Sequence, residues 1–234
     1  MLSYVILYPA VEIGGNNILQ YLFAGLLTLD AGLHMFACAS RDRLMLRRIT
    51  KCLLMPLLAA CYAVFCVSPI ASVFAAILFG FAGDVVLLFR PRRFAFPAGI
   101  LAFAAGHVFY IISFAKRFAV APPWFLFAVF GVISLLCASL LISYLWKGLP
   151  KKLRAPSFVY MLIIGAMVSF SALFTLYAAS AHRWFALVGG VLFAISDTTL
   201  SIDAFHHPVR YRNVIVMSTY IAAQTLIVSA LAFS

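Results

Sequence analysis

Two aspartates occupy stretches of the chain that are otherwise apolar. Asp84 lies in GDVVLL at 83–88, and Asp197 lies in GGVLFAISDTTLSIDAF at 189–205. A charged residue in the hydrocarbon layer of a membrane costs about 3 kcal/mol, so each of these residues is a candidate for function. Two buried carboxylates can divide their roles between one protonated acid and one ionised base. The pair therefore favours general acid–base chemistry, although each aspartate could also simply tie helices together through hydrogen bonds.

Further polar side chains fall in the same apolar stretches. His107 and Tyr110 are three residues apart, and Tyr220 and Gln224 are four apart, so each pair shares one face of a helix. Lys51 begins an apolar run, where it either extends to the membrane interface or pairs with an acid. The predicted substrate-binding residues are Lys51, His107, Tyr110, Tyr160, Ser196, Tyr220 and Gln224.

Other candidate sites are weaker. Asp30 and His34 form an i, i+4 pair that we interpret as a contact between helices, and Asp203 is expected to form an interfacial cap or ion pair. His206–His207 are adjacent, a spacing that does not direct both rings to one ion, and the five cysteines include no CxxC pair. We expect no metal site and no cofactor.

Composition sets the fold class. The chain of 234 residues is 66% hydrophobic and only 10% charged, and a soluble domain of this length cannot bury that much apolar surface. We predict an all-α polytopic bundle, a single integral membrane domain over residues 1–234. Eight runs are long enough to span a bilayer. They are 18–40, 50–67, 70–89, 94–116, 124–146, 157–180, 184–203 and 211–233.

The basic residues lie in short clusters between these runs. This distribution argues against a nucleic-acid partner despite the net charge of +11. Fourteen of the 17 Lys and Arg residues lie in or beside the odd-numbered connections. Because cytoplasmic loops carry the excess of positive charge, we expect those connections to face the cytoplasm and both termini to be non-cytoplasmic.

A short internal repeat relates the two aspartates. GDVVL at 83–87 and SDTTL at 196–200 lie near the ends of the third and seventh runs. His107 follows Asp84 by 23 residues, and Tyr220 follows Asp197 by 23. Runs that lie four apart point in the same direction, so the repeat hints at two parallel four-helix halves.

Several motifs occur in an order that resembles a known family. They are Lys51 with LLMPLL at 53–58, GDVVLL at 83–88, GHVFY at 106–110, the segment 189–205 and YIAAQTLIV at 220–228. Together they resemble the YhhN-type lysoplasmalogenases, which are multipass membrane proteins. The resemblance covers roughly residues 20–230. One departure is that Cys52 follows Lys51 where the family usually has proline, and proline comes only at Pro56.

The resemblance implies eight spans and hydrolysis of the vinyl ether bond of a lysoplasmalogen, with a fatty aldehyde and a glycerophospho head group as products. It also implies that Asp84 and Asp197 are the catalytic pair. Vinyl ether hydrolysis proceeds through protonation at carbon and a cation that water captures, so it needs one acid and one base, as glycoside hydrolysis does. Apolar walls between helices would hold the alkenyl chain. The expected partners are a lysophospholipid substrate and membrane lipids.

Alternatives remain at this point. Buried Asp and His residues on parallel repeats also suit a small proton-coupled transporter. A structural or lipid-sensing membrane protein is a further alternative. A compact multi-pass chain fits a bacterial inner membrane or the endoplasmic reticulum, and we expect the former. Oligomeric state and head-group preference stay open.

Overall fold

The computed structural model describes residues 16–40, 42–88 and 95–234, and this part of the chain contains eight α-helices and no strands. All eight are long and apolar enough to cross a membrane, which confirms the predicted all-α membrane fold. Residues 1–15, expected to be non-cytoplasmic, and the basic connection 89–94 lie outside the described residues. The helices are α1 (Asn16–Ala39), α2 (Leu44–Phe65), α3 (Ala71–Leu88), α4 (Ala95–Ala115), α5 (Trp124–Leu145), α6 (Lys151–Tyr177), α7 (Arg183–Phe205) and α8 (Arg212–Ala232).

Two helices begin earlier than the apolar runs predict. α2 begins at Leu44 rather than at 50, and α6 begins at Lys151 rather than at 157. Pro156, which directly precedes the apolar run 157–180, therefore lies inside α6, and Pro56 lies inside α2. Apolar runs mark where the hydrocarbon begins, whereas a helix continues through the basic interfacial turn as long as its backbone stays hydrogen-bonded.

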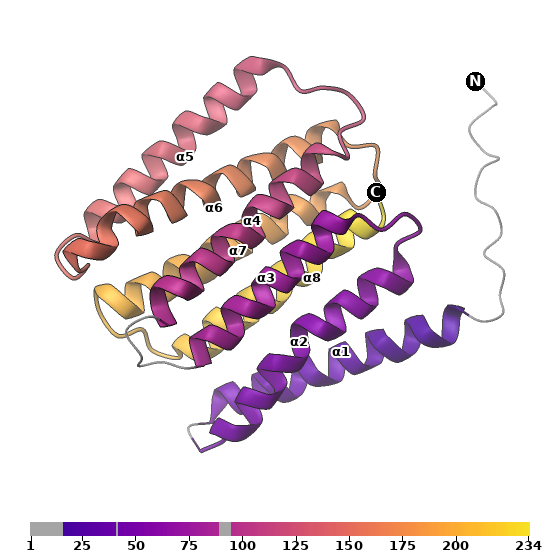
Figure 1. Ribbon diagram of the computed structural model, residues 1–234, viewed down its shortest axis with the longest axis horizontal. Coiled ribbons are helices and arrows are strands. Elements are labelled where there is room, and N and C mark those ends of the chain that lie inside the picture. Colours follow the sequence, from indigo (N-terminus) through magenta and orange to yellow (C-terminus); the bar gives the residue numbers. More distant parts are fainter. Residues whose placement is uncertain (1–15, 41, 89–94) are drawn as a thin grey trace.

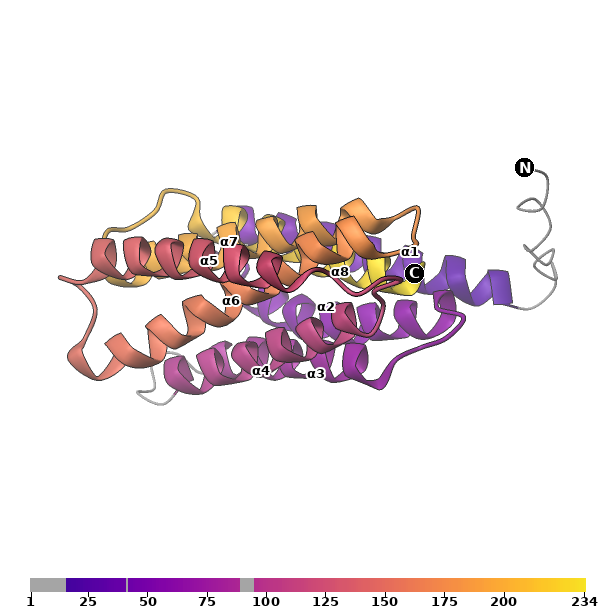
Figure 2. The same cartoon turned by 90° about the horizontal axis from the view of Figure 1, so that it is seen from above.

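Six helices form a closed ring. In order around the ring they are α2, α3, α4, α6, α7 and α8, and α8 packs back against α2. α1 lies outside the ring against α2 and α8, and α5 lies outside it against α6 and α7. In Figure 1 the α1–α2 pair and the α5–α6 pair accordingly lie at opposite edges of the bundle, and Figure 2 shows α3 and α4 on the side away from α7 and α8.

The helix pairs of the ring follow the short sequence repeat. α3 packs on α4 as α7 packs on α8, and α2 bridges α3 and α8 as α6 bridges α7 and α4. Asp84 on α3 and Asp197 on α7 thus occupy equivalent places in the two halves of the ring. This arrangement agrees with the predicted parallel four-helix halves.

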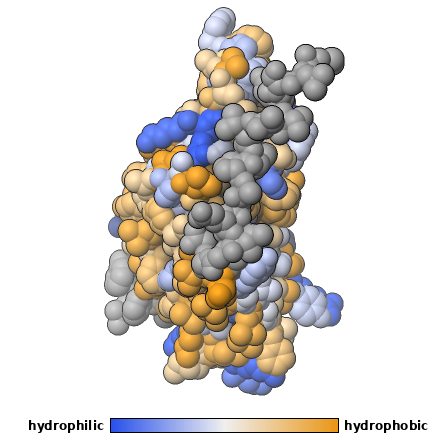
Figure 3. Space-filling model, turned by 90° about the vertical axis from the view of Figure 1, so that its right-hand side faces the viewer, coloured by the Kyte–Doolittle hydropathy of each residue, from blue (hydrophilic) through white to orange (hydrophobic). Residues whose placement is uncertain are grey.

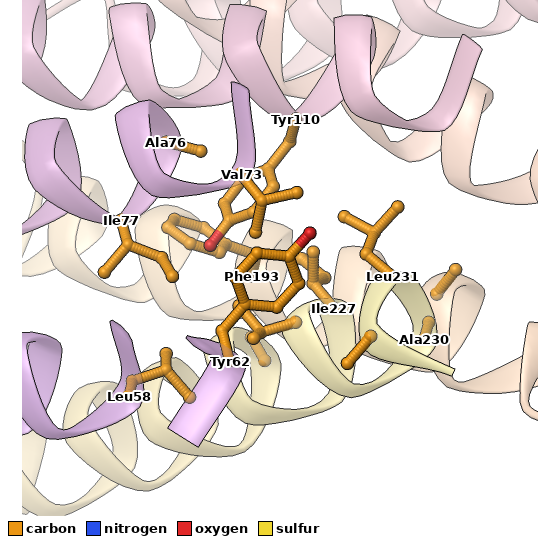
Figure 4. Close-up of a cluster of buried hydrophobic side chains, with 14 of the residues drawn as sticks. Leu58, Tyr62, Val73, Ala76, Ile77, Tyr110, Phe193, Ile227, Ala230 and Leu231 are labelled. Carbon is orange, nitrogen blue, oxygen red and sulfur yellow. The ribbon is translucent and has the colours of Figure 1, made fainter. Parts of the chain in front are cut away.

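The ring has an apolar core near its centre. Tyr62, Tyr110 and Phe193 are among the largest fully buried side chains, and they meet aliphatic residues of α2, α3 and α8 (Figure 4). The outer faces carry many exposed large apolar residues, as expected for a surface in contact with lipid. Hydrophobic residues also dominate the face drawn in Figure 3.

Glycines allow the closest helix contacts around the site. A Cβ on Gly189 of α7 would lie 2.9 Å from the carbonyl oxygen of Ala223 and 2.8 Å from Ile227 on α8. A Cβ on Gly80 of α3 would lie 3.3 Å from Nε2 of Gln224. Only glycine therefore permits α7 to approach the backbone of α8 this closely, in the way small residues mediate helix packing in membranes.

We expect Gly189→Leu to push α7 away from α8 and to destabilise the bundle by about 1–3 kcal/mol, the usual cost of overpacking. The measurement is the midpoint of thermal unfolding in detergent. Gly25→Leu on α1 is the matched control, because a Cβ there meets nothing within 4 Å. Equal midpoints for the two variants would contradict the close approach of α7 and α8.

Candidate active site

A polar chamber of about 370 Å³ lies within the ring, toward the end of the bundle that carries the basic helix ends. Asp84 and Asp197 both line it, on α3 and α7, so the structure brings the two predicted aspartates into one cavity. Further lining residues come from α1, α2, α4, α7 and α8. Among them are His34, Arg47, Arg48, Lys51, Phe103, Ser196, Arg212, Asn213 and Tyr220.

The carboxylate of Asp84 has both a cationic partner and a hydroxyl partner. Nζ of Lys51 on α2 lies 3.1 Å from Oδ1, and the hydroxyl of Tyr220 on α8 donates to Oδ2 at 2.9 Å. Asp84 is almost fully buried, with 2% of its surface exposed. Lys51 therefore pairs with an acid inside the bundle and does not extend to the interface.

A chain of hydrogen bonds continues from Asp84 into the core. Nε2 of Gln224 donates to the hydroxyl of Tyr220 at 3.4 Å, and the hydroxyl of Tyr110 donates to Oε1 of Gln224 at 2.5 Å. The chain joins α2, α3, α4 and α8, and its members are buried. Tyr110 and Gln224 thus support the site from behind Asp84 and do not themselves line the chamber.

Asp197 is held differently. The hydroxyl of Tyr160 on α6 donates to its Oδ2. Among the described residues Asp197 takes part in no ion pair within 4.0 Å, in contrast to Asp84. Each aspartate thus accepts a hydrogen bond from the helix that precedes it in its half of the ring. The donor to Asp84 is the ammonium group of Lys51 on α2, and the donor to Asp197 is the phenol of Tyr160 on α6.

Two predicted residues have other roles. The hydroxyl of Ser196 lines the chamber but donates to the carbonyl of Val216 at 3.0 Å, which joins α7 to α8. His107 is buried behind the chamber, and neither of its ring nitrogens has a hydrogen-bond partner in the described chain. Its ring packs on Phe193 and Tyr160, with centroids 4.4 and 5.9 Å away.

The arginines of the chamber, unlike Lys51, were not predicted as site residues. Arg47, Arg48 and Arg212 line it, together with Asn213. Arg212 also pairs with Asp203 at 2.9 Å, which confirms the interfacial ion pair expected for Asp203. Arg47 could have been found from its position four residues before Lys51, because this spacing places both residues on one face of α2.

A second cavity, which we call the α5 cleft, lies between α5, α6 and α7. Its volume is about 310 Å³ and its walls are mostly apolar. Asp197 and Tyr160 line this cleft as well, so Asp197 is accessible from both cavities. The remaining lining residues include Phe130, Ile133, Cys137, Leu141, Ile164, Val168, Ala172, Leu187 and Ala194.

The Asp30–His34 pair contributes to helix packing through His34. Nδ1 of His34 on α1 lies 2.7 Å from the hydroxyl of Thr50 on α2, and both residues are buried. This contact confirms the predicted contact between helices. The carboxylate oxygen Oδ2 of Asp30 is buried and has no hydrogen-bond partner in the described chain.

The fold and the chamber define a polytopic membrane protein with a two-carboxylate site inside its helix bundle. The chain belongs to the YhhN family: residues 46–231 match the model of that family. This finding confirms the resemblance seen in the ordered motifs.

Relatives of known name are similar over part of the chain. Lysoplasmalogenase TMEM86A of Bos taurus is 32% identical over 158 residues, and TMEM86A of Homo sapiens is 32% identical over 159 residues. Each match covers 66% of this chain and 62% of the relative. Lysoplasmalogenase TMEM86B of Homo sapiens is 30% identical over 145 residues, 62% of this chain and 56% of the relative. No solved structure matches.

The ion pair between Lys51 and Asp84 leads to a stability prediction. Lys51→Met leaves Asp84 buried without its cation, and we expect a loss of about 3 kcal/mol in the free energy of unfolding, because breaking a buried pair strands the other charge. Unfolding by denaturant in detergent micelles measures this loss. Lys51→Met combined with Asp84→Asn should recover most of it, since no charge is then stranded.

Arg212→Met is the matched control for this prediction. It removes the cation of the more exposed pair with Asp203, where the Arg212 side chain is 38% exposed, so the loss should stay below about 1 kcal/mol. Similar losses in the two cation variants, or no recovery in the double variant, would argue against a buried pair at Asp84.

Proposed function

We propose that this chain hydrolyses the vinyl ether bond of a lysoplasmalogen and releases a fatty aldehyde and a glycerophospho head group. One observation supports the proposal most directly: the buried carboxylate of Asp84 and the partly buried carboxylate of Asp197 line the same chamber but have different partners. Asp84 is paired with Lys51, whereas Asp197 is hydrogen-bonded to the neutral hydroxyl of Tyr160. The names of the similar mammalian proteins support the same reaction.

The different partners suggest which aspartate is the acid. A neighbouring ammonium group favours the ionised form of a carboxyl group, and Asp84 has one at 3.1 Å. We therefore assign the base to Asp84 and the acid to Asp197. In the first step the carboxyl of Asp197 transfers its proton to the β-carbon of the vinyl ether, which is the alkenyl carbon that is not bonded to the oxygen. The π electrons form the new C–H bond, and the ether oxygen stabilises the resulting cation.

Water completes the reaction from the polar chamber. A water molecule next to Asp84 attacks the cationic carbon and gives a proton to that carboxylate. The hemiacetal then collapses: its hydroxyl proton goes to Asp197, its bond to the glycerol oxygen breaks, and Asp84 returns the proton to that oxygen. Both aspartates end the cycle as they began it, and no cofactor is required.

The remaining chamber residues suit the head group of such a lipid. A lysophospholipid carries a phosphate, and Arg47, Arg48 and Arg212 offer cationic donors at the same end of the chamber. Ser196 and Tyr220 also line the chamber, and the hydroxyl of Tyr220 donates to Asp84 at 2.9 Å, so it would orient the glycerol or the attacking water at that carboxylate. Tyr110, Gln224 and His107 act from behind the chamber, by holding Tyr220 and Tyr160 in place.

The first test is the release of aldehyde from alkenyl-lysophosphoethanolamine by the purified protein. We expect Asp84→Asn and Asp197→Asn each to lower turnover by at least 1000-fold, in the range seen when one member of a catalytic group is removed. Asp42→Asn is the matched control, because Asp42 is exposed and does not line the chamber, and it should stay within about threefold of the unaltered protein. Tyr110→Phe should cost about tenfold through the displaced Gln224.

Activity retained by either chamber variant would remove that aspartate from the mechanism. If the folded protein releases no aldehyde from any head group, the proposed reaction is wrong, and proton-coupled flux into liposomes then tests the transporter alternative.

The mechanism also predicts which bond breaks. Water attacks the alkenyl carbon, so hydrolysis in ¹⁸O-labelled water should leave the glycerol hydroxyl unlabelled. In deuterated water the aldehyde, trapped at once by reduction, should carry deuterium on the carbon next to the carbonyl. Mass spectrometry of both products measures the two labels. Label in the glycerol hydroxyl would mean attack at the glycerol carbon and would exclude protonation by Asp197 as the first step.

A further inference from the structure

We infer that the α5 cleft binds the alkenyl chain of the substrate, with the chain running from Asp197 away from the basic helix ends. The inference rests on the proposed function for the identity of the lipid. Three features of the cleft support a binding site for a hydrocarbon chain: its apolar walls, its shared border with the chamber at Asp197, and its length.

The walls of the cleft are suited to a hydrocarbon chain. α5 contributes Phe130, Ile133 and Leu141, and the facing helices contribute further apolar residues, including Ile164 and Val168. The hydroxyl of Ser169 donates to the carbonyl of Gly165 at 2.8 Å and accepts a hydrogen bond from the hydroxyl of Ser134 at 3.1 Å, so neither of these two serines presents an unpaired donor to a bound chain. Such a surface favours the binding of an apolar ligand, because the ligand buries its apolar area against a pocket that fits it.

The cleft meets the polar chamber at the proposed acid. Asp197 lines both cavities, and its partner Tyr160 lines the cleft. Asp84 lines only the chamber. In a vinyl ether the carbon that takes water is bonded to the ether oxygen. The carbon that takes the proton is the next one along the alkenyl chain. The positions of the two aspartates thus match the order of these atoms along the lipid.

The part of the cleft that extends from Asp197 away from the basic helix ends corresponds in length to one lipid chain. The lining on α7 extends from Ser201 to Leu187, and the part between Asp197 and Leu187 covers ten residues or about 15 Å of helix. The hydrocarbon layer is about 30 Å thick, so one chain in one leaflet spans about half of that. The polar head group then lies near the basic helix ends and the chain points toward the bilayer centre, which is also the direction of a lipid in that leaflet.

The position of α5 provides a lateral entrance. α5 lies outside the ring and packs only on α6 and α7 among the helices with substantial contacts. Its residues Ser134, Ala138, Ile142 and Leu145 form one buried stripe, and the rest of the helix faces outward. A chain can therefore enter from the bilayer beside α5, without crossing the ring.

Two variants with opposite expected effects test the inference. Ala172 and Leu187 line the cleft at the end far from Asp197. Ala172→Phe shortens the cleft and should lower the ratio of kcat/KM for a long over a short alkenyl chain about tenfold. Leu187→Ala lengthens it and should raise the same ratio about fourfold, the effect of roughly one buried methylene. The substrates are alkenyl-lysophosphoethanolamines that differ only in chain length.

Ala128→Phe is the matched control, because Ala128 is exposed on α5 and does not line the cleft. It should leave the ratio unchanged. An unchanged ratio in both cleft variants, or an equal shift in the control, would overturn the inference. Leu187→Ala removes volume only, so it decides the question even if Ala172→Phe does not fold.

A binding measurement separates this inference from the proposed function. Cys137 lines the cleft and is exposed, so a lipid-soluble maleimide should alkylate it. A saturated alkyl-lysophosphoethanolamine has no vinyl ether to hydrolyse, and we expect it to slow this alkylation at least fivefold, while glycerophosphoethanolamine does not. Protection without any aldehyde release from alkenyl lipids would support the cleft and refute the reaction. Aldehyde release without protection would support the reaction and refute the cleft.

Discussion

The structure depends on one constraint: a carboxylate inside an apolar helix bundle must have partners. Asp84 meets this constraint with Lys51 and Tyr220, at 3.1 and 2.9 Å. Because Tyr220 is in turn held by Gln224 and Gln224 by Tyr110, these contacts join Asp84 on α3 to three further helices of the ring, α2, α4 and α8. Satisfying a single buried charge thus fixes how these helices meet and keeps a polar chamber open between them.

Asp197 meets the same constraint with fewer partners. In the described chain the hydroxyl of Tyr160 donates to its carboxylate, and the residue lines both the polar chamber and the α5 cleft. The two halves of the ring are alike in helix packing but differ in the chemistry of this partner, a lysine in one half and a tyrosine in the other. We regard this difference as the source of the proposed division between a base and an acid.

Much of the fold could be predicted from the sequence, because hydrocarbon thickness and backbone hydrogen bonding leave few choices for apolar runs of about 20 residues. The starts of α2 and α6 could not, since charged residues such as Lys151 extend a helix beyond the hydrocarbon. The two aspartates were recognisable because charge is rare in these runs. Arg48 and Arg212 of the chamber were not, because they lie among the basic residues expected at any cytoplasmic connection. The α5 cleft depends on helix packing, which periodicity does not reveal.

The most direct test is an experimental structure of the Asp197→Asn variant with an alkenyl-lysophosphoethanolamine bound but not turned over. We expect the vinyl ether to lie between position 197 and Asp84, with a water molecule beside Asp84. The phosphate should lie toward Arg47 and Arg212, and the alkenyl chain between α5, α6 and α7. A lipid bound with its ether bond away from both positions would contradict the two-aspartate mechanism.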